Sequence, residues 1–168
     1  MTRIFFLPIL SLPLLLAACG AESSKEAGSP IAGEYRQILK ITEFDMPGFK
    51  GEEKQHNIDE MEKLAGGDEG QKICLKGGEQ WKEAGTQMAT MLGGNCLTNA
   101  ESDTDATFEL RMQCKATANG DVNILMTGQS HTAGYAVKMT FDMQDPNSSA
   151  TAKLAMAIDA ERVGDCGG

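Results

Sequence analysis

The sequence predicts an α+β fold: an antiparallel β-meander of about six or seven strands, as a curved sheet or partly open barrel, with two helices inserted near its start. Apolar and polar residues alternate over much of the chain, which is typical of strands with one buried face. Helical spacing is confined to two stretches between residues 51 and 94. The later strands follow one another through short turns, and consecutive strands joined in this way are most simply antiparallel neighbours.

The first strand is expected from Ile31 to Glu43, where alternate positions are apolar: Ile31, Tyr35, Leu39 and Ile41. Met46-Pro47-Gly48 then predicts a turn. The first helix is expected between residues 51 and 67, with Asn57 as N-cap and Glu60 completing a capping box.

A short strand over residues 71–76 precedes the second helical stretch. The apolar positions of that stretch are Trp81, Ala84, Met88, Met91 and Leu92. Gly93-Gly94 is a typical C-cap signal and predicts the end of the helix.

The second half of the chain contains strand and turn patterns only. Alternating segments run over residues 108–114, 122–126, 135–143 and 154–160. Asn119-Gly120 favours a tight hairpin, and Asp145-Pro146-Asn147 predicts a further turn.

The first eighteen residues have the pattern of an export signal rather than of the fold. A positive start, Met1-Thr2-Arg3, precedes an apolar run that is too short to span a membrane comfortably. Leu16-Ala17-Ala18-Cys19 closes the run and resembles the lipobox of bacterial lipoproteins, which implies a lipidated Cys19 as mature N-terminus. An ordinary cleaved signal is the alternative. Gly20 instead of Asp after the cysteine resembles outer-membrane sorting, so the expected location is the periplasmic face of the outer membrane.

This interpretation divides the chain into a signal peptide (1–18), a lipidated N-terminus with a flexible tether (19–32) and one periplasmic domain (33–168). The signal contains one arginine and no acidic residue, so its removal changes the formal charge from −9 to −10. Acidic surface repels nucleic acid and anionic lipid, which makes the lipid on Cys19 the expected membrane contact and excludes a nucleic-acid partner.

The five cysteines then separate into Cys19 and four others. Three connectivities are possible for four cysteines. Cys96 and Cys114 flank an expected hairpin and stand at comparable heights on its strands, which favours a disulfide between them. Cys74 and Cys166 remain as the second pair. A zinc or redox site is the alternative, but the chain has no CxxC motif and no histidine at finger-like spacing.

No recognisable catalytic arrangement is present, so the sequence predicts a protein without enzymatic activity and without a cofactor. His56 and His131 lie in polar stretches away from any identifiable nucleophile, and the glycines form no phosphate-binding loop. Ten methionines allow Cu(I) binding, with Met88 and Met91 near each other on one helical face. The favoured interpretation is that methionine fills an irregular core in a chain with few aromatic residues. A flexible, methionine-lined interior also suits an apolar ligand.

Several short motifs resemble a family of bacterial envelope proteins catalogued as domain of unknown function 3617. They are Gly33-Glu34-Tyr35, Met46-Pro47-Gly48, Cys74-Leu75, the mid-chain cysteines and Gly164-Asp165-Cys166. The family implies an exported, disulfide-containing domain and brings no known activity or binding residues. The expected function is therefore a binding or structural role in the envelope, with a hydrophobic-ligand or lipid-binding module as the alternative and methionine-based copper binding as a weaker one.

Overall fold

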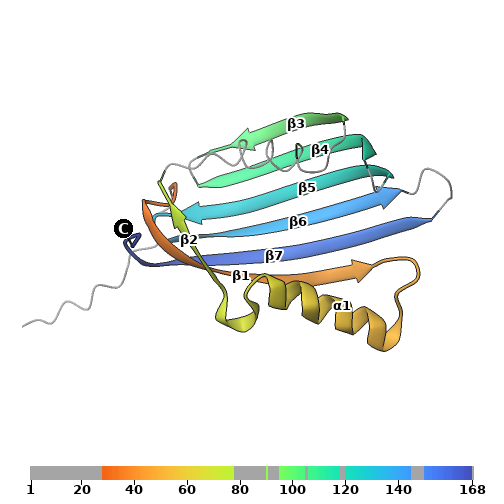
Figure 1. Cartoon of the computed structure of the whole chain (residues 1–168). Coiled ribbons are helices and arrows are strands. Elements are labelled where there is room, and N and C mark those ends of the chain that lie inside the picture. The colour runs from red at the N-terminus through yellow and green to blue at the C-terminus, as the bar shows by residue number, and fades with distance from the viewer. Residues whose placement is uncertain are drawn as a thin grey trace, which may run out of the picture.

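The computed structural model describes residues 28–77, 90, 95–104, 106–117, 120–144 and 150–167. Its elements, in chain order, are β1 (Gly33–Asp45), α1 (Gly51–Leu64), the 3-10 turn η1 (Gly67–Glu69), β2 (Gln71–Leu75), β3 (Asn95–Asp103), β4 (Thr107–Thr117), β5 (Gly120–His131), β6 (Gly134–Gln144) and β7 (Thr151–Gly164). The strands form one curved antiparallel sheet (Figure 1), which confirms the α+β class in its broad form.

The order of strands across the sheet is β2-β1-β7-β6-β5-β4-β3. Strands β3 to β7 are the expected meander, and each pairs with the next. The first strand departs from a simple meander because β1 lies between β2 and β7, so that the beginning and end of the domain pair with each other. β2 and β3, although consecutive, lie at opposite edges. Alternation of apolar and polar residues indicates that a segment forms a strand, but it carries little information about which distant strand pairs with it.

One face of the sheet is apolar, as the alternation predicts. Its buried core residues are Tyr35, Phe108, Leu110, Met112, Cys114, Val122, Ile124, Met126, Tyr135, Val137, Met139 and Ala160. Methionines therefore contribute to the core at several positions, and Met143 and Met156 pack against it while partly buried. Gly128 faces the Phe108 ring across the β4–β5 pair: a Cβ at Gly128 would lie 2.3 Å from a ring carbon.

Helix α1 begins earlier than expected. It starts at Gly51 with Lys50 in the N-cap position, and the expected N-cap Asn57 lies inside the helix, where its amide donates to the Glu53 carbonyl. The prediction of a cap at Asn57 was wrong. Glu52 and Glu53 occupy the first turn, where negative charge interacts favourably with the helix dipole, and this compensates for the missing side-chain cap.

The helix runs beneath the edge of the sheet along β1 (Figure 1) and has no fully buried residue. Its attachment is largely polar. The Glu62 carboxylate accepts a hydrogen bond of 2.7 Å from the backbone N–H of Ile41 and also lies 3.3 Å from the Lys40 ammonium. The contact covers part of the β1 edge that β2, which pairs only with Gly33–Gln37, leaves open.

The described residues contain one α-helix, whereas two were expected. The second expected helix, over residues 81–94, lies outside the described residues except for Thr90, whose backbone is helical. Among the described residues, none belongs to a helix long and apolar enough to cross a membrane.

Candidate functional site

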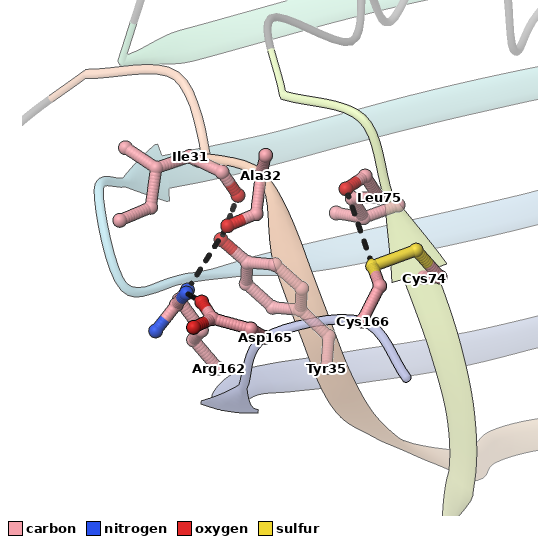
Figure 2. Close-up of a disulfide and its surroundings, with 8 residues drawn as sticks. All are labelled: Ile31, Ala32, Tyr35, Cys74, Leu75, Arg162, Asp165 and Cys166. Atoms are coloured by element: carbon pink, nitrogen blue, oxygen red, sulfur yellow. Dashed lines mark hydrogen bonds and ion pairs between the residues drawn. A yellow bond between two sulfur atoms is a disulfide. The ribbon is translucent and has the colours of Figure 1, made fainter. Parts of the chain in front are cut away.

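The end of the sheet where the chain enters the domain is held by a disulfide. Cys74, on edge strand β2, is bonded to Cys166, two residues beyond the end of β7, with a Cα–Cα distance of 5.6 Å. The C-terminal segment therefore reaches across to β2 at this end of the sheet (Figure 2). Both cysteines are exposed, so the bond lies at the surface of the domain.

Tyr35 and Arg162 hold the incoming segment at the same end (Figure 2). The buried Tyr35 hydroxyl donates to the Ile31 carbonyl at 2.7 Å and lies 3.3 Å from the Thr132 carbonyl. Arg162 donates from Nε to the Ala32 carbonyl at 3.1 Å and forms an ion pair with Asp165. We call Ile31, Ala32, Tyr35, Cys74, Arg162, Asp165 and Cys166 the end clamp.

The packed part of the chain begins before the expected domain start at Gly33. The Ile31 N–H donates to the Thr132 carbonyl at 3.2 Å, and the Gly28 N–H donates to the Ser130 carbonyl at 3.5 Å. Pro30 is fully buried. Residues 28–32 were expected to belong to a flexible tether over residues 19–32, but they are fixed against the end of β5 and the turn after it.

The second disulfide joins neighbouring strands. Cys96 on β3 and Cys114 on β4 are directly opposite in the register and are bonded. Cys114 is fully buried in the core, and Cys96 packs against that core. The structure thus brings together both cysteine pairs that were named from the sequence, and it contains the disulfide bonds expected there.

A cluster of charged side chains lies beside α1. The Lys40 ammonium lies 2.7 Å from the Asp68 carboxylate in η1. Hydrogen bonding to Lys40 lowers the pKa of Asp68 below its ordinary value, and hydrogen bonds to Asp68 and Glu62 raise the pKa of Lys40. Through Lys40, the cluster connects β1 to Glu62 on α1 and to Asp68 in η1. Because Lys40 and Asp68 are exposed, these ion pairs contribute little to the stability of the domain.

The sheet face opposite the core contains a hollow of about 520 Å³ over β3, β4, β5 and β6. It is lined by Ser102, Thr107, Phe108, Glu109, Thr127, Gly128, Gln129, Ala136 and Lys138. The register aligns Ser102, Glu109, Thr127 and Lys138 in one row across four strands. The next row contains Thr107, Gln129 and Ala136. Short side chains at Thr127 and Ala136 lie between longer ones, which produces the depression. We call it the polar hollow.

Sequence reasoning missed the polar hollow because its residues occupy the polar positions of ordinary strand alternation. Such positions are most often solvated surface, and only the register brings those of four strands into one depression. The available signal was Gly128, because a glycine inside a strand often marks a place where a ligand or another part of the chain approaches the backbone closely.

The remaining candidate residues are dispersed. His56 is exposed on α1, and His131, at the end of β5, accepts a hydrogen bond through Nδ1 from the Ala133 N–H at 3.2 Å. Within the described residues, no group of three or more His, Cys, Asp and Glu side chains is placed to hold a metal ion. Cys19, Met88 and Met91 lie outside the described residues.

Comparison with known families accounts for nearly all of the packed domain. No curated protein and no solved structure matches the chain. Residues 30–166 match the family described as protein of unknown function DUF3617. The match begins at buried Pro30 and ends at Cys166 of the end clamp, so its limits lie close to those of the packed residues that the structure describes. The chain belongs to the DUF3617 family.

Proposed function

We propose that this protein is a lipoprotein of the bacterial envelope, anchored to the membrane through Cys19, whose disulfide-braced domain has a non-enzymatic binding role. The observation that carries the proposal is the pairing of the other four cysteines in two disulfides. Structural disulfides form and persist in oxidising compartments such as the periplasm. With these four cysteines bonded to one another, Cys19 is the thiol left for lipid attachment.

The hydrogen bonds that fix residues 28–32 to the sheet limit how far the domain can lie from a lipid on Cys19. Eight residues, and so nine Cα–Cα steps, lie between Cys19 and Gly28, the first described residue that is hydrogen-bonded to the sheet. A fully extended chain covers at most about 3.3–3.6 Å per residue, so the domain lies within about 30 Å of its lipid. The end clamp then faces the membrane side of the domain, and the rest of the sheet extends away from it.

The test is the mass of the protein extracted from bacterial membranes after expression of the full chain. We expect a polypeptide that begins at Cys19 and carries a diacylglyceryl group, with or without a further acyl chain. Cys19→Ser should abolish both the acylation and the membrane fractionation. Cys166→Ser is the matched control: it removes a cysteine of the end clamp and should leave acylation intact. Wild-type protein that is released without lipid, or that retains residues 1–18, would refute the anchoring.

A further inference from the structure

We propose that the polar hollow binds a small acidic carbohydrate, a sugar bearing both a carboxylate and hydroxyl or amide groups. The inference rests on the proposed binding role and specifies its ligand class. The hollow measures about 520 Å³, within the range of roughly 300–1,000 Å³ typical of small-molecule sites. It lies on the sheet face opposite the apolar core, so its ligand need not enter the protein interior.

The hollow contains several hydrogen-bonding groups that the rest of the described chain leaves available. The side chains of Ser102, Thr127, Gln129 and Lys138 make no hydrogen bond or ion pair with any other described residue. Thr107 differs from them because its hydroxyl pairs with that of Thr104 at 3.0 Å. The available groups are two hydroxyls, one amide and one ammonium, a set that suits a ligand with many hydroxyls.

Glu109 adds an acceptor whose orientation is already fixed. Arg111 donates from Nε to the Oε1 atom of Glu109 at 2.8 Å, and Nη2 of the same guanidinium lies 2.8 Å from that oxygen as an ion pair. The second carboxylate oxygen, Oε2, has no such contact with the described residues and can accept from a hydroxyl or amide N–H. Because the arginine balances the charge of Glu109, this side of the hollow favours polar groups over cations.

Lys138 supplies the anion-binding group at the other side. It stands in the same row as Glu109, with Thr127 between them, so the two backbone positions are separated by about two strand spacings of 4.8 Å. The nearest acidic position on β7 is Asp159, which lies opposite Ala136 rather than Lys138. A sugar across the row would place its carboxylate at Lys138 and its hydroxyl or amide groups at Thr127, Gln129 and Glu109.

The floor of the hollow is rigid enough to hold that arrangement. Gly128 and Phe108 contribute to it, and the Phe108 ring, packed directly against Gly128 on the core face, supports this part of the sheet. The binding groups lie on paired strands rather than on loops, which limits the ordering needed when a ligand binds.

The experiment is saturation-transfer NMR on the full mature protein in phosphocholine micelles, with two sugars that differ in one group. N-acetylmuramic acid has the carboxylate, the hydroxyls and the amide, whereas N-acetylglucosamine lacks the carboxylate. We expect saturation of the acidic sugar, and weaker saturation of the neutral one. Lys138→Gln should weaken binding of the acidic sugar by about three- to tenfold, corresponding to about 0.7–1.4 kcal/mol, and change binding of the neutral sugar little.

Two further variants complete the test. Lys115→Gln removes a lysine from β4 outside the hollow and should leave both sugars unaffected, which separates site binding from general charge. Ala136→Phe fills the hollow at an exposed strand position and should abolish both signals while circular dichroism shows the fold intact. The proposal is overturned if neither sugar is saturated, if both bind equally to wild type and K138Q, or if folded A136F still binds. Acylation at Cys19 is read from the mass of the protein, so either proposal can fail without the other.

Discussion

Breaking the disulfide of the end clamp should remove much of the domain's stability. Cys74 and Cys166 are separated by 92 residues, and the chain-entropy account gives about 4–5 kcal/mol for closing a loop of that length in the unfolded state. Both cysteines are exposed, so serine in their place leaves no cavity and adds no packing loss. Domains of this size are stable by about 5–15 kcal/mol, so the double variant C74S/C166S should be folded only marginally.

Urea denaturation followed by circular dichroism measures this loss. With a slope of about 2 kcal/mol per molar urea, the midpoint should fall by about 2 M. Each single variant breaks the same bond, so C74S, C166S and the double variant should lose nearly equal amounts, and this strong non-additivity is an internal control. A loss below about 1 kcal/mol would refute the reasoning, because it would mean that pairing of β1 with β7 already constrains the chain as much as the bond does.

Three further predictions follow from individual contacts. Tyr35→Phe should cost about 1–2 kcal/mol in urea denaturation, because the Ile31 carbonyl loses its buried donor, and a cost near zero would contradict that role. Gly128→Ala should cost about 1–3 kcal/mol through the clash with the Phe108 ring, whereas Gly164→Ala, with no atom within 4 Å of the new Cβ, should change the thermal midpoint little. Lys40→Gln should return the lowered pKa of Asp68 toward its ordinary value in an NMR titration, and Lys153→Gln, which removes the partner of Glu43, should not; an unchanged Asp68 pKa in K40Q would refute the pairing.

The ion pair between Lys40 and Asp68 also determines how the stability of the domain depends on pH. The folded-state pKa of Asp68 is lowered, so its contribution to stability is complete above the ordinary aspartate value and is lost as the pH falls through the lowered value. The pKa of Lys40 is raised, so its contribution is complete below the ordinary lysine value and is lost as the pH rises through the raised one. Both groups are exposed, so each effect is small.

Local patterns in the sequence predict the strands well because each strand has one buried face. The alternation over residues 108–114 and 135–143 corresponds to β4 and β6, and the hairpin expected at residues 119–120 joins paired strands. Partners distant in sequence could not be predicted in the same way. Nothing within β1 specifies that it pairs with β7. Any strand of similar length with an apolar face could form the same backbone hydrogen bonds with it.

The end clamp and the polar hollow differ in how far the sequence predicts them. The cysteine count and hairpin geometry identify the bonded pairs of the chain. The Tyr35 hydroxyl, by contrast, contacts a carbonyl 97 residues away, and Glu109 and Lys138 come together only through the register of three strands. Such contacts depend on tertiary placement, which composition and spacing do not encode.

The pairing of β1 with β7 also determines when the domain can form. Glu34 and Gly164 are partners although about 130 residues separate them, so β1 has no complete sheet to join until the last strand has been delivered. Strands β3 to β7, by contrast, form through neighbouring hairpins and can assemble in order. Non-local pairing of this kind slows folding. If the chain is exported as proposed, β3 to β7 can pair as they emerge, but the sheet is completed only after β7 has crossed the membrane and β1 has paired with it.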